Sequence, residues 1–256
     1  MPIEFVDFES ARNRDGLRLV VVPGVPSPWG EAAKGILHVK RIPYAAVRLD
    51  VSNAELVAWA GEASGPVAIY GDEPPRGGWA EILLLAEHLA PEPALLPRDP
   101  AERALVFGLG HEICGEMGLG WARRLAGVHA GLEGGPGFPK PVAQYLADKY
   151  GYRESEGPRY TPRVCSLLEM LTARLHAQAA AGSGFYVGNA LTAVDLYSAA
   201  FMALFQPLPP AQCPMPDAMR EAFTASDDAT LKALDPVLLD HRDRIYAEFL
   251  ELPLSL

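Results

Sequence analysis

The side chains that most often carry nucleophilic or metal chemistry are scattered in this sequence. The three cysteines, Cys114, Cys165 and Cys213, lie far apart, and none forms a C-x-x-C pair. This pattern disfavours both a disulfide framework and a zinc ribbon. The six histidines show no H-E-x-x-H or related spacing, so we expect no bound metal. We interpret the cysteines as small apolar side chains in a reducing compartment, with a reactive thiol as the alternative.

One serine stands where a helix is expected to begin. Ser27 precedes Pro28, and serine followed by proline at the first helical position is a common N-cap arrangement. A helix N-terminus with free N–H groups and a hydroxyl donor also favours the thiolate form of a thiol, whose ordinary pKa is ~8.5. Ser27 is therefore a candidate both for a structural cap and for a group that activates a thiol, and the two roles are compatible.

The composition limits the partners of the chain. Its 256 residues include 22 Lys and Arg against 32 Asp and Glu, a formal net charge of −10, which argues against non-specific binding to nucleic acid or anionic membranes. No apolar run approaches the roughly 20 residues that cross a bilayer. The N-terminus lacks the basic start and apolar stretch of a secretory signal. We expect a soluble cytoplasmic protein that binds neither nucleic acid nor membranes.

The elements that would position Ser27 form a small α/β domain over residues 17–91. β-branched runs predict strands, and apolar residues at helical spacing predict helices between them. The strands are predicted over residues 17–22, 45–49 and 65–70 and the helices over about 30–40, 54–60 and 79–89. The loop over residues 71–78 could hold a short fourth strand. Residues 1–16 are mixed and polar, so we predict an extension that lies on the surface of this domain.

A second domain over residues 100–256 follows a proline-rich linker over residues 92–99. Helical periodicity dominates from there on, and several helix starts carry their own signals. Thr192 is a predicted N-cap, and Asp195 stands where it can bond back to the backbone of the cap. The other starts are predicted at Asp99-Pro100, Thr161-Pro162 and Asp235-Pro236. The sequence thus predicts a small α/β domain followed by an all-helical one.

This layout, together with four local strings, resembles the glutathione transferase superfamily, in the form of a serine-type, bacterial-like cytosolic member. The strings are Ser27-Pro28-Trp29, Gly65-Pro66-Val67, the helix 81–89 with its continuation to Pro100, and the segment Tyr186–Asp195. Each string is weak alone, but all four occur in the expected order, and the resemblance covers about residues 17–250. It implies a thioredoxin-like N-terminal domain followed by an all-helical C-terminal domain.

The resemblance implies a glutathione site in the first domain, formed by Ser27, Trp29, Gly65, Pro66, Glu81 and Ile82. Ser27 would be the catalytic residue that stabilises the glutathione thiolate. Pro66 would follow a cis bond and present the backbone of Gly65 to the tripeptide, with a trans proline as the alternative. Glu81 would hold the α-amino group, with helix N–H groups taking the carboxylate. Ile82 departs from the family, which has a carboxylate-binding serine there.

A second substrate would lie against the first long helix of the helical domain. The candidates on that helix are His111, Met117, Trp121 and Arg124, and a packed core is the competing interpretation for this stripe. Three basic residues could add positive charge near the glutathione site, although exposed helix ends often carry such residues: Lys34, Lys40 and Arg41. Arg76, in the loop before the last helix of the first domain, is a further candidate, with a solvated loop arginine as the alternative.

The resemblance implies a glutathione transferase and does not choose among addition, substitution, thiolytic ether cleavage and isomerisation. Glutathione would be the co-substrate, a hydrophobic electrophilic small molecule the second substrate, and a homodimer the assembly. The absence of cysteine at position 27 disfavours a glutaredoxin-like reductase. The alternative function is a transferase-like fold that binds ligands or proteins without turnover, which Ile82 favours.

Overall fold

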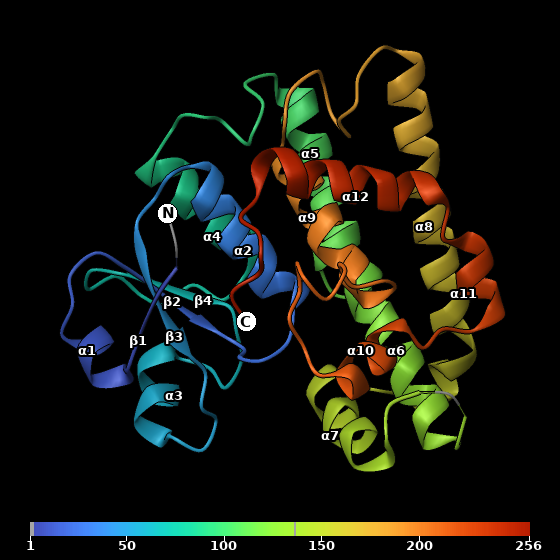
Figure 1. The fold of residues 1–256 in the computed structure, drawn as a ribbon, viewed down its shortest axis with the longest axis horizontal. Coiled ribbons are helices and arrows are strands. Elements are labelled where there is room, and N and C mark those ends of the chain that lie inside the picture. The colour runs from blue at the N-terminus through green and yellow to red at the C-terminus, as the bar shows by residue number, and fades with distance from the viewer. Residues whose placement is uncertain (1–2, 136) are drawn as a thin grey trace.

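The computed structural model describes residues 3–135 and 137–256, which form two lobes (Figure 1). No helix within these ranges is both long and apolar enough to span a membrane. The strands are β1 (Glu4–Val6), β2 (Leu17–Val21), β3 (Tyr44–Arg48) and β4 (Val67–Tyr70). The helices of the first lobe are α1 (Phe8–Arg12), α2 (Pro28–Val39), α3 (Ala54–Ala60) and α4 (Trp79–Leu89).

The first lobe is a four-stranded sheet in the order β1-β3-β2-β4, with helices on both faces. β3 runs parallel to β1 and β2, and β4 runs antiparallel to β2. Side chains alternate between the faces along each strand. Leu19 and Val21 belong to the core that includes α2 and α4, whereas Val20 packs with residues of α1 and α3. The sheet and its helices have the layered arrangement expected of a thioredoxin-like domain.

The N-terminal residues differ from the predicted surface extension. β1 pairs with β3 in the register Glu4↔Ala45 to Val6↔Val47, and Ala11 of α1 is fully buried. The first lobe therefore includes residues before position 17. A three-residue edge strand has only one neighbour and exposed polar side chains, so it lacks the β-branched run that marks an inner strand. The loop over residues 71–78 contributes a single bridge, Ala68↔Arg76, rather than a fourth strand.

The second lobe is helical, as predicted. Its helices are α5 (Pro100–Cys114), α6 (Leu119–Leu132), α7 (Lys140–Tyr150), α8 (Gly157–Ala180), α9 (Ala193–Phe201), α10 (Asp217–Thr224), α11 (Asp228–Ala233) and α12 (Pro236–Phe249), with 3₁₀ turns η1 (Glu154–Glu156) and η2 (Met202–Leu204). α8 begins at Gly157, before the predicted start at Thr161.

The first long helix of this lobe is broken, contrary to the prediction that one helix carries the second-substrate residues. α5 ends at Cys114 and α6 begins at Leu119, and Met117 between them has a positive φ of 57°. Gly115 and Gly118 flank the turn, and glycine is a poor helix former. The helical spacing that linked residues 111–124 therefore does not hold across this turn.

α9 is the central helix of the molecule, and all nine of its residues are buried. Asp195 fixes its first turn, as predicted, by accepting hydrogen bonds from the backbone N–H and the hydroxyl of Thr192 at 2.8 and 3.0 Å. The same carboxylate accepts the Tyr186 N–H at 2.9 Å and contacts His241 Nε2 of α12 at 3.0 Å. One carboxylate thus joins α9, the segment before it and α12.

We expect Asp195→Asn to lower the free energy of unfolding by about 3 kcal/mol, because its single amide oxygen cannot accept both the Thr192 bonds made to Oδ2 and the Tyr186 N–H bond made to Oδ1 in a fully buried site. Denaturant unfolding followed by circular dichroism measures the change. The matched control is Asp235→Asn, because Asp235 is a half-buried N-cap that accepts one N–H, from Val237. This control should cost about 1 kcal/mol or less. Equal losses in the two variants would contradict the central role of Asp195.

Candidate functional site

Ser27 lies at the N-terminus of α2, where the sequence placed it. It occupies the N-cap position with φ −62° and ψ 115°, and its carbonyl oxygen accepts the Glu31 N–H at 2.8 Å. Its side chain makes no capping hydrogen bond, so the structural role predicted for the hydroxyl is not seen. Ser27 is only 6% exposed, which limits access to a narrow approach. The hydroxyl can therefore donate to a group held at the N-terminus of α2.

Trp29 connects this helix start to the second lobe. Its indole Nε1–H donates to the Cys114 carbonyl oxygen at 2.8 Å, and its ring meets the Phe201 ring edge-on with centroids 4.8 Å apart. Gly120 of α6 makes this approach possible, because a Cβ there would lie 2.9 Å from the Trp29 ring. Trp29, predicted to bind glutathione, thus also holds α2 against α5, α6 and α9.

The Gly65–Pro66 peptide bond is cis, as the resemblance implied. Pro66 lies at the start of β4 and lines a small apolar cavity with Trp29, Gly77 and Ile82, among other residues. This cavity brings together three residues predicted for the glutathione site: Trp29, Pro66 and Ile82.

Two exposed carboxylates approach consecutive glycines before α4. Glu81 bends back so that its Oε2 accepts the Gly78 N–H at 3.1 Å. Glu62, which follows α3, lies against Gly77, where a Cβ would overlap its carboxylate. The first-lobe side of the site therefore carries two negative charges, and the Gly78 N–H at the start of α4 already has a protein partner. Carboxylates in this position suit an ammonium group better than a second carboxylate.

Ile82 lines the small cavity beside Trp29 and Pro66 with an apolar side chain that belongs to the core. It is 2% exposed and packs in the core formed by α2, α4 and the sheet. Its position on the inner face of α4 favours an apolar side chain, because burial of isoleucine stabilises the fold by about 2 kcal/mol. The departure from the family serine thus replaces a polar group by a core residue.

The second-lobe side of the site is aromatic and positive. The Arg124 guanidinium of α6 lies 5.3 Å from the centroid of the Trp29 ring and 5.5 Å from that of the Tyr150 ring. The Trp121 ring meets Tyr150 edge-on with centroids 4.8 Å apart. Lys149, beside Tyr150 at the end of α7, has its pKa lowered by burial and then by the charge of Arg124, with Glu62 opposing. Arg124 thus lies beside Trp29, whereas the ring of Trp121 contacts that of Tyr150.

His111 and Met117 are tied to other parts of the molecule. His111 is exposed near the end of α5, and its ring packs against the turn at Gly115. The Met117 carbonyl oxygen accepts the Arg163 Nε–H of α8 at 3.1 Å. The break between α5 and α6 removes the shared helical face on which these two residues were grouped with Trp121 and Arg124.

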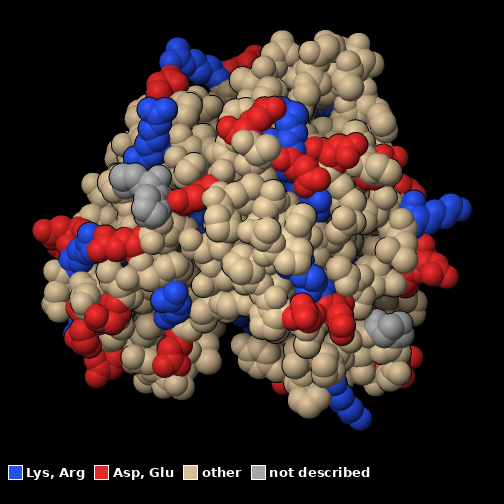
Figure 2. Space-filling view, in the orientation of Figure 1, with Lys and Arg blue, Asp and Glu red and all other residues tan. Residues whose placement is uncertain are grey.

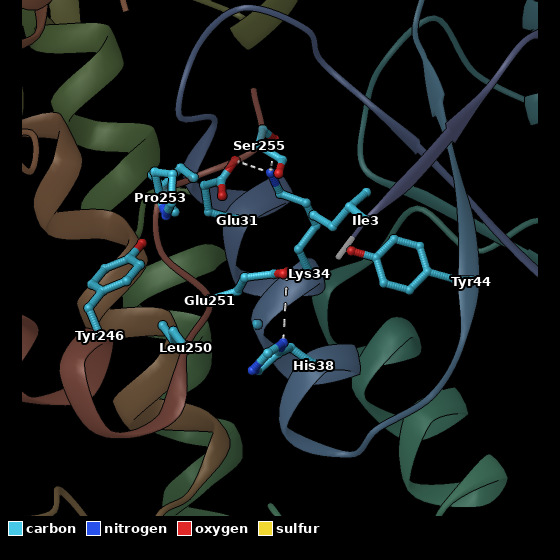
Figure 3. A pocket seen from close by; sticks show the side chains of 12 residues that line it. Ile3, Glu31, Lys34, His38, Tyr44, Tyr246, Leu250, Glu251, Pro253 and Ser255 are labelled. Atoms are coloured by element: carbon cyan, nitrogen blue, oxygen red, sulfur yellow. Dashed lines mark hydrogen bonds and ion pairs between the residues drawn. The ribbon is translucent and has the colours of Figure 1, made fainter. Parts of the chain in front are cut away.

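Lys34 and Lys40 do not give the site free positive charge, contrary to the expectation from the sequence. Lys34 Nζ lies 2.6 Å from Glu31 Oε1 and donates to the Ser255 carbonyl oxygen at 2.8 Å, so that it holds the C-terminal tail beside α2 (Figure 3). Lys40 Nζ lies 2.6 Å from Glu87 Oε1 and donates to two carbonyl oxygens after α4. Both lysines are buried structural cations.

Arg41 and Arg76 also lie apart from Ser27. Arg41 follows the C-terminal end of α2, about 20 Å from Ser27 at the rise of an α-helix. It lines a separate cavity of about 390 Å³ with residues that include His38 and Glu251. Arg76 pairs with Glu73 at 2.5 Å and forms the bridge to Ala68. Neither is free to add charge at the N-terminus of α2.

The cysteines lack the features of a reactive thiol. All three are free, and burial raises the pKa of Cys114, Cys165 and Cys213 alike. Their thiols therefore stay protonated near neutral pH. Within residues 3–135 and 137–256, no group of three His, Cys, Asp or Glu side chains is placed to hold a metal ion.

Sequence reasoning missed Glu62, Lys149 and Tyr150. Glu62 lies in a turn after a short helix, and the other two end a helix that carried no start signal in the sequence. A charged residue near a chain turn is usually solvated, so its type alone carries no functional signal. The place of Lys149 and Tyr150 near Arg124, and of Glu62 against Gly77, depends on tertiary packing.

No family model matches the sequence, and a search of curated proteins finds no match. Solved structures, however, share the fold at low sequence identity. A glutathione transferase family member from Pseudomonas fluorescens pf-5, with two glutathione molecules bound, has a TM-score of 0.60, 14% identity, and coverage of 91% of this chain and 89% of the other. A beta-etherase from Sphingobium sp. strain SYK-6 has a TM-score of 0.62, 15% identity, and coverage of 91% and 96%.

A third similar structure is the nitrogen regulation fragment of the yeast prion protein Ure2p, with a TM-score of 0.57, 16% identity, and coverage of 91% and 92%. All three alignments include both lobes, since each covers about nine tenths of this chain. The chain therefore has the glutathione transferase fold, with a thioredoxin-like domain followed by a helical domain.

We expect Lys34→Met to lower the free energy of unfolding by about 3 kcal/mol, because it leaves Glu31 buried without its partner. Burial raises the pKa of Glu31, and Lys34 opposes this effect, so the variant should raise that pKa further. Between its ordinary value of 4.5 and the raised value, the folded form binds more protons than the unfolded form. The difference in free energy of unfolding between the variant and the wild type should thus shrink as the pH falls from about 8 to about 5.

Urea unfolding at several pH values measures this effect. The matched control is the double variant Glu31→Leu/Lys34→Met, which removes both charges and should lie within about 1 kcal/mol of the wild type. A pH-independent deficit in the single variant would show that Glu31 is not the group responsible.

Proposed function

We propose that the protein is a glutathione transferase whose Ser27 hydroxyl stabilises the glutathione thiolate. The observation that carries this proposal is the position of Ser27: it is the N-cap of α2, yet its hydroxyl makes no capping bond. A thiolate beside it receives the hydroxyl hydrogen bond and the favourable field of the helix N-terminus. The shared fold of a structure with bound glutathione supports the proposal.

Glutathione binds with its peptide backbone beside Pro66 and its α-amino group towards Glu81. The nearby Glu62 adds a second negative charge on this side, which attracts the ammonium group. Trp29 packs against the ligand next to Ser27. In this proposal Gly65, Pro66 and Glu81 keep the roles that the resemblance implied, and Ile82 supports the site only from the core.

The chemistry begins when the glutathione thiol releases its proton to solvent. Ser27 donates a hydrogen bond to the resulting thiolate, which lowers the pKa of the thiol. The sulfur then attacks an electrophilic carbon held between Trp29 and α6. Substitution, addition, ether cleavage and isomerisation all begin with this attack, and the group that leaves or shifts belongs to the substrate.

A second candidate function is a ligand-binding or protein-interaction module without turnover. Two observations favour it: Ile82 replaces a polar ligand by a core side chain, and Glu81 already occupies the Gly78 N–H at 3.1 Å. A carboxylate of glutathione would therefore meet fewer free donors at the start of α4. One structure with this fold is a nitrogen regulation fragment, which is consistent with such a module.

A homodimer and a cytoplasmic location are further parts of the proposal, implied by the resemblance. The net charge of −10 favours a protein that binds no nucleic acid or anionic membrane. Leu84 on α4 is an exposed large apolar residue that a second copy could cover.

We expect Ser27→Ala to keep glutathione affinity within about threefold of the wild type, since the hydroxyl contacts mainly the developing thiolate, and to lower kcat/KM about 100-fold with a reactive aryl halide. The ultraviolet absorbance of the bound thiolate should disappear in the variant. Calorimetry with glutathione and difference spectroscopy measure binding and ionisation separately.

The matched control is Ser166→Ala, because Ser166 is an exposed serine on α8 whose hydroxyl bonds only to the Arg163 carbonyl oxygen. It should leave binding, ionisation and turnover unchanged. Absence of glutathione binding to the wild type at millimolar concentration would refute the transferase proposal and favour the non-catalytic module. Binding without thiolate would refute the role of Ser27 and leave a glutathione carrier.

A further inference from the structure

Arg124 is a half-buried cation at the junction of the lobes. Its Nε is buried and has no hydrogen-bond partner. No ion pair joins its guanidinium to a carboxylate within the parts of the chain that the structure describes. The neighbouring Arg123, in contrast, bonds to the carbonyl oxygens of Leu204 and Ala225 and to the Ser226 hydroxyl. Buried donors are normally satisfied, so the unpaired Nε–H of Arg124 indicates a missing acceptor.

The groups around Arg124 do not supply that acceptor. The rings of Trp29 and Tyr150 lie within cation–π distance of the guanidinium and can hold its charge, but they accept no ordinary hydrogen bond. Lys149 adds a second positive charge nearby; its pKa is lowered first by burial and then by the charge of Arg124. Two like charges close together, in a chain with a net charge of −10, are stabilised by an anion between or beside them.

An apolar cavity adjoins the same arginine. Arg124 lines a cavity of about 40 Å³ between α6, η2 and α10, together with Phe138, Leu204 and Phe223. In the orientation of Figure 1, the space-filling view shows a notch at the lower edge of the molecule, between the sheet lobe and the end of the helical lobe that carries α7 (Figure 2). Arg124 therefore lies beside two aromatic rings and also lines an apolar cavity.

We propose that the second-substrate site takes an anionic aromatic or apolar compound, whose carboxylate is held by the Arg124 guanidinium with Lys149 as a second cation. The inference deepens the proposed function, on which it rests for the position of the reacting sulfur. It narrows the hydrophobic electrophile expected from the sequence to one that carries an anionic group. A planar guanidinium binds a carboxylate through two parallel hydrogen bonds, whereas a neutral amide of the same shape forms weaker ones.

A matched pair of probes tests the charge requirement. 4-Chloro-3-nitrobenzoate and 4-chloro-3-nitrobenzamide differ only in the carboxylate. With glutathione, the thiolate sulfur forms a C–S bond at the chlorinated carbon, the C–Cl bond breaks, and chloride leaves with its electron pair. Quenching of tryptophan fluorescence gives the affinity of each probe without glutathione, and calorimetry gives the affinity for glutathione alone.

We expect the wild type to bind the benzoate about tenfold more tightly than the benzamide. Arg124→Gln should bring this ratio close to one, and Arg124→Lys should retain part of it. Lys149→Gln, at an exposed position, should lower the ratio about threefold and make it less sensitive to salt. The matched control is Arg103→Gln, because Arg103 on α5 is also half-buried and lies 5.3 Å from an aromatic ring, that of Phe107. It should leave the ratio unchanged.

Equal affinity of the wild type for the two probes overturns the inference, and so does a preference that Arg124→Gln leaves intact. If Arg124→Gln weakens glutathione binding and leaves the probe ratio unchanged, Arg124 belongs to the glutathione site and the inference also fails. Benzoate preference without glutathione binding supports the inference and refutes the transferase proposal. Glutathione binding without a preference for the benzoate refutes the inference and leaves the transferase proposal standing. Circular dichroism and the Arg124→Lys and Lys149→Gln variants separate loss of charge from misfolding.

Discussion

The buried carboxylate of Asp195 is the constraint on which the rest of the structure depends. It accepts two hydrogen bonds from Thr192 and one from the Tyr186 N–H, and it contacts His241 of α12. These bonds begin α9 at one residue and fix its direction. Because every residue of α9 is buried, a shift of this helix would move the surfaces on which α2, α5 and α12 pack. The site follows from that arrangement, since Phe201 at the other end of α9 supports the Trp29 ring.

Trp29 transmits this arrangement to the N-terminus of α2. Its indole bonds to α5, and its ring packs against α9 and lies beside Arg124 of α6. Ser27, two residues earlier, is thereby held at the junction of the lobes. The buried lysines of α2 also hold this helix in place, because Lys34 bonds to the C-terminal tail and Lys40 bonds to the segment after α4. Because these two lysines are paired, the positive charge at the junction of the lobes comes from Arg124 and Lys149 instead.

The two walls of the site have opposite charge, which has a direct chemical meaning. The sheet lobe presents Glu62 and Glu81, and the helical lobe presents Arg124 and Lys149. An ammonium group is stabilised on the first wall and a carboxylate on the second. In the proposed complex, the first wall would meet the α-amino end of glutathione. Ile82 is a core side chain and offers no polar group to an anion, whereas the second wall carries two cations.

The sequence by itself determined the features that depend on neighbours within a few residues. The helix starts at Asp99 and Asp235 were predictable because each side chain accepts an N–H two residues away, and the start at Thr192 because Asp195, three residues on, accepts the Thr192 N–H. The order of a small α/β domain and a helical domain followed from local periodicity. Tertiary structure alone decided the site, because its contacts join distant residues: Trp29 to Cys114 across 85 positions, and Lys34 to Ser255 across 221. The same packing turned two predicted free lysines into buried structural groups and left Arg124 without a partner, since charge type is local but its neutralisation depends on the fold.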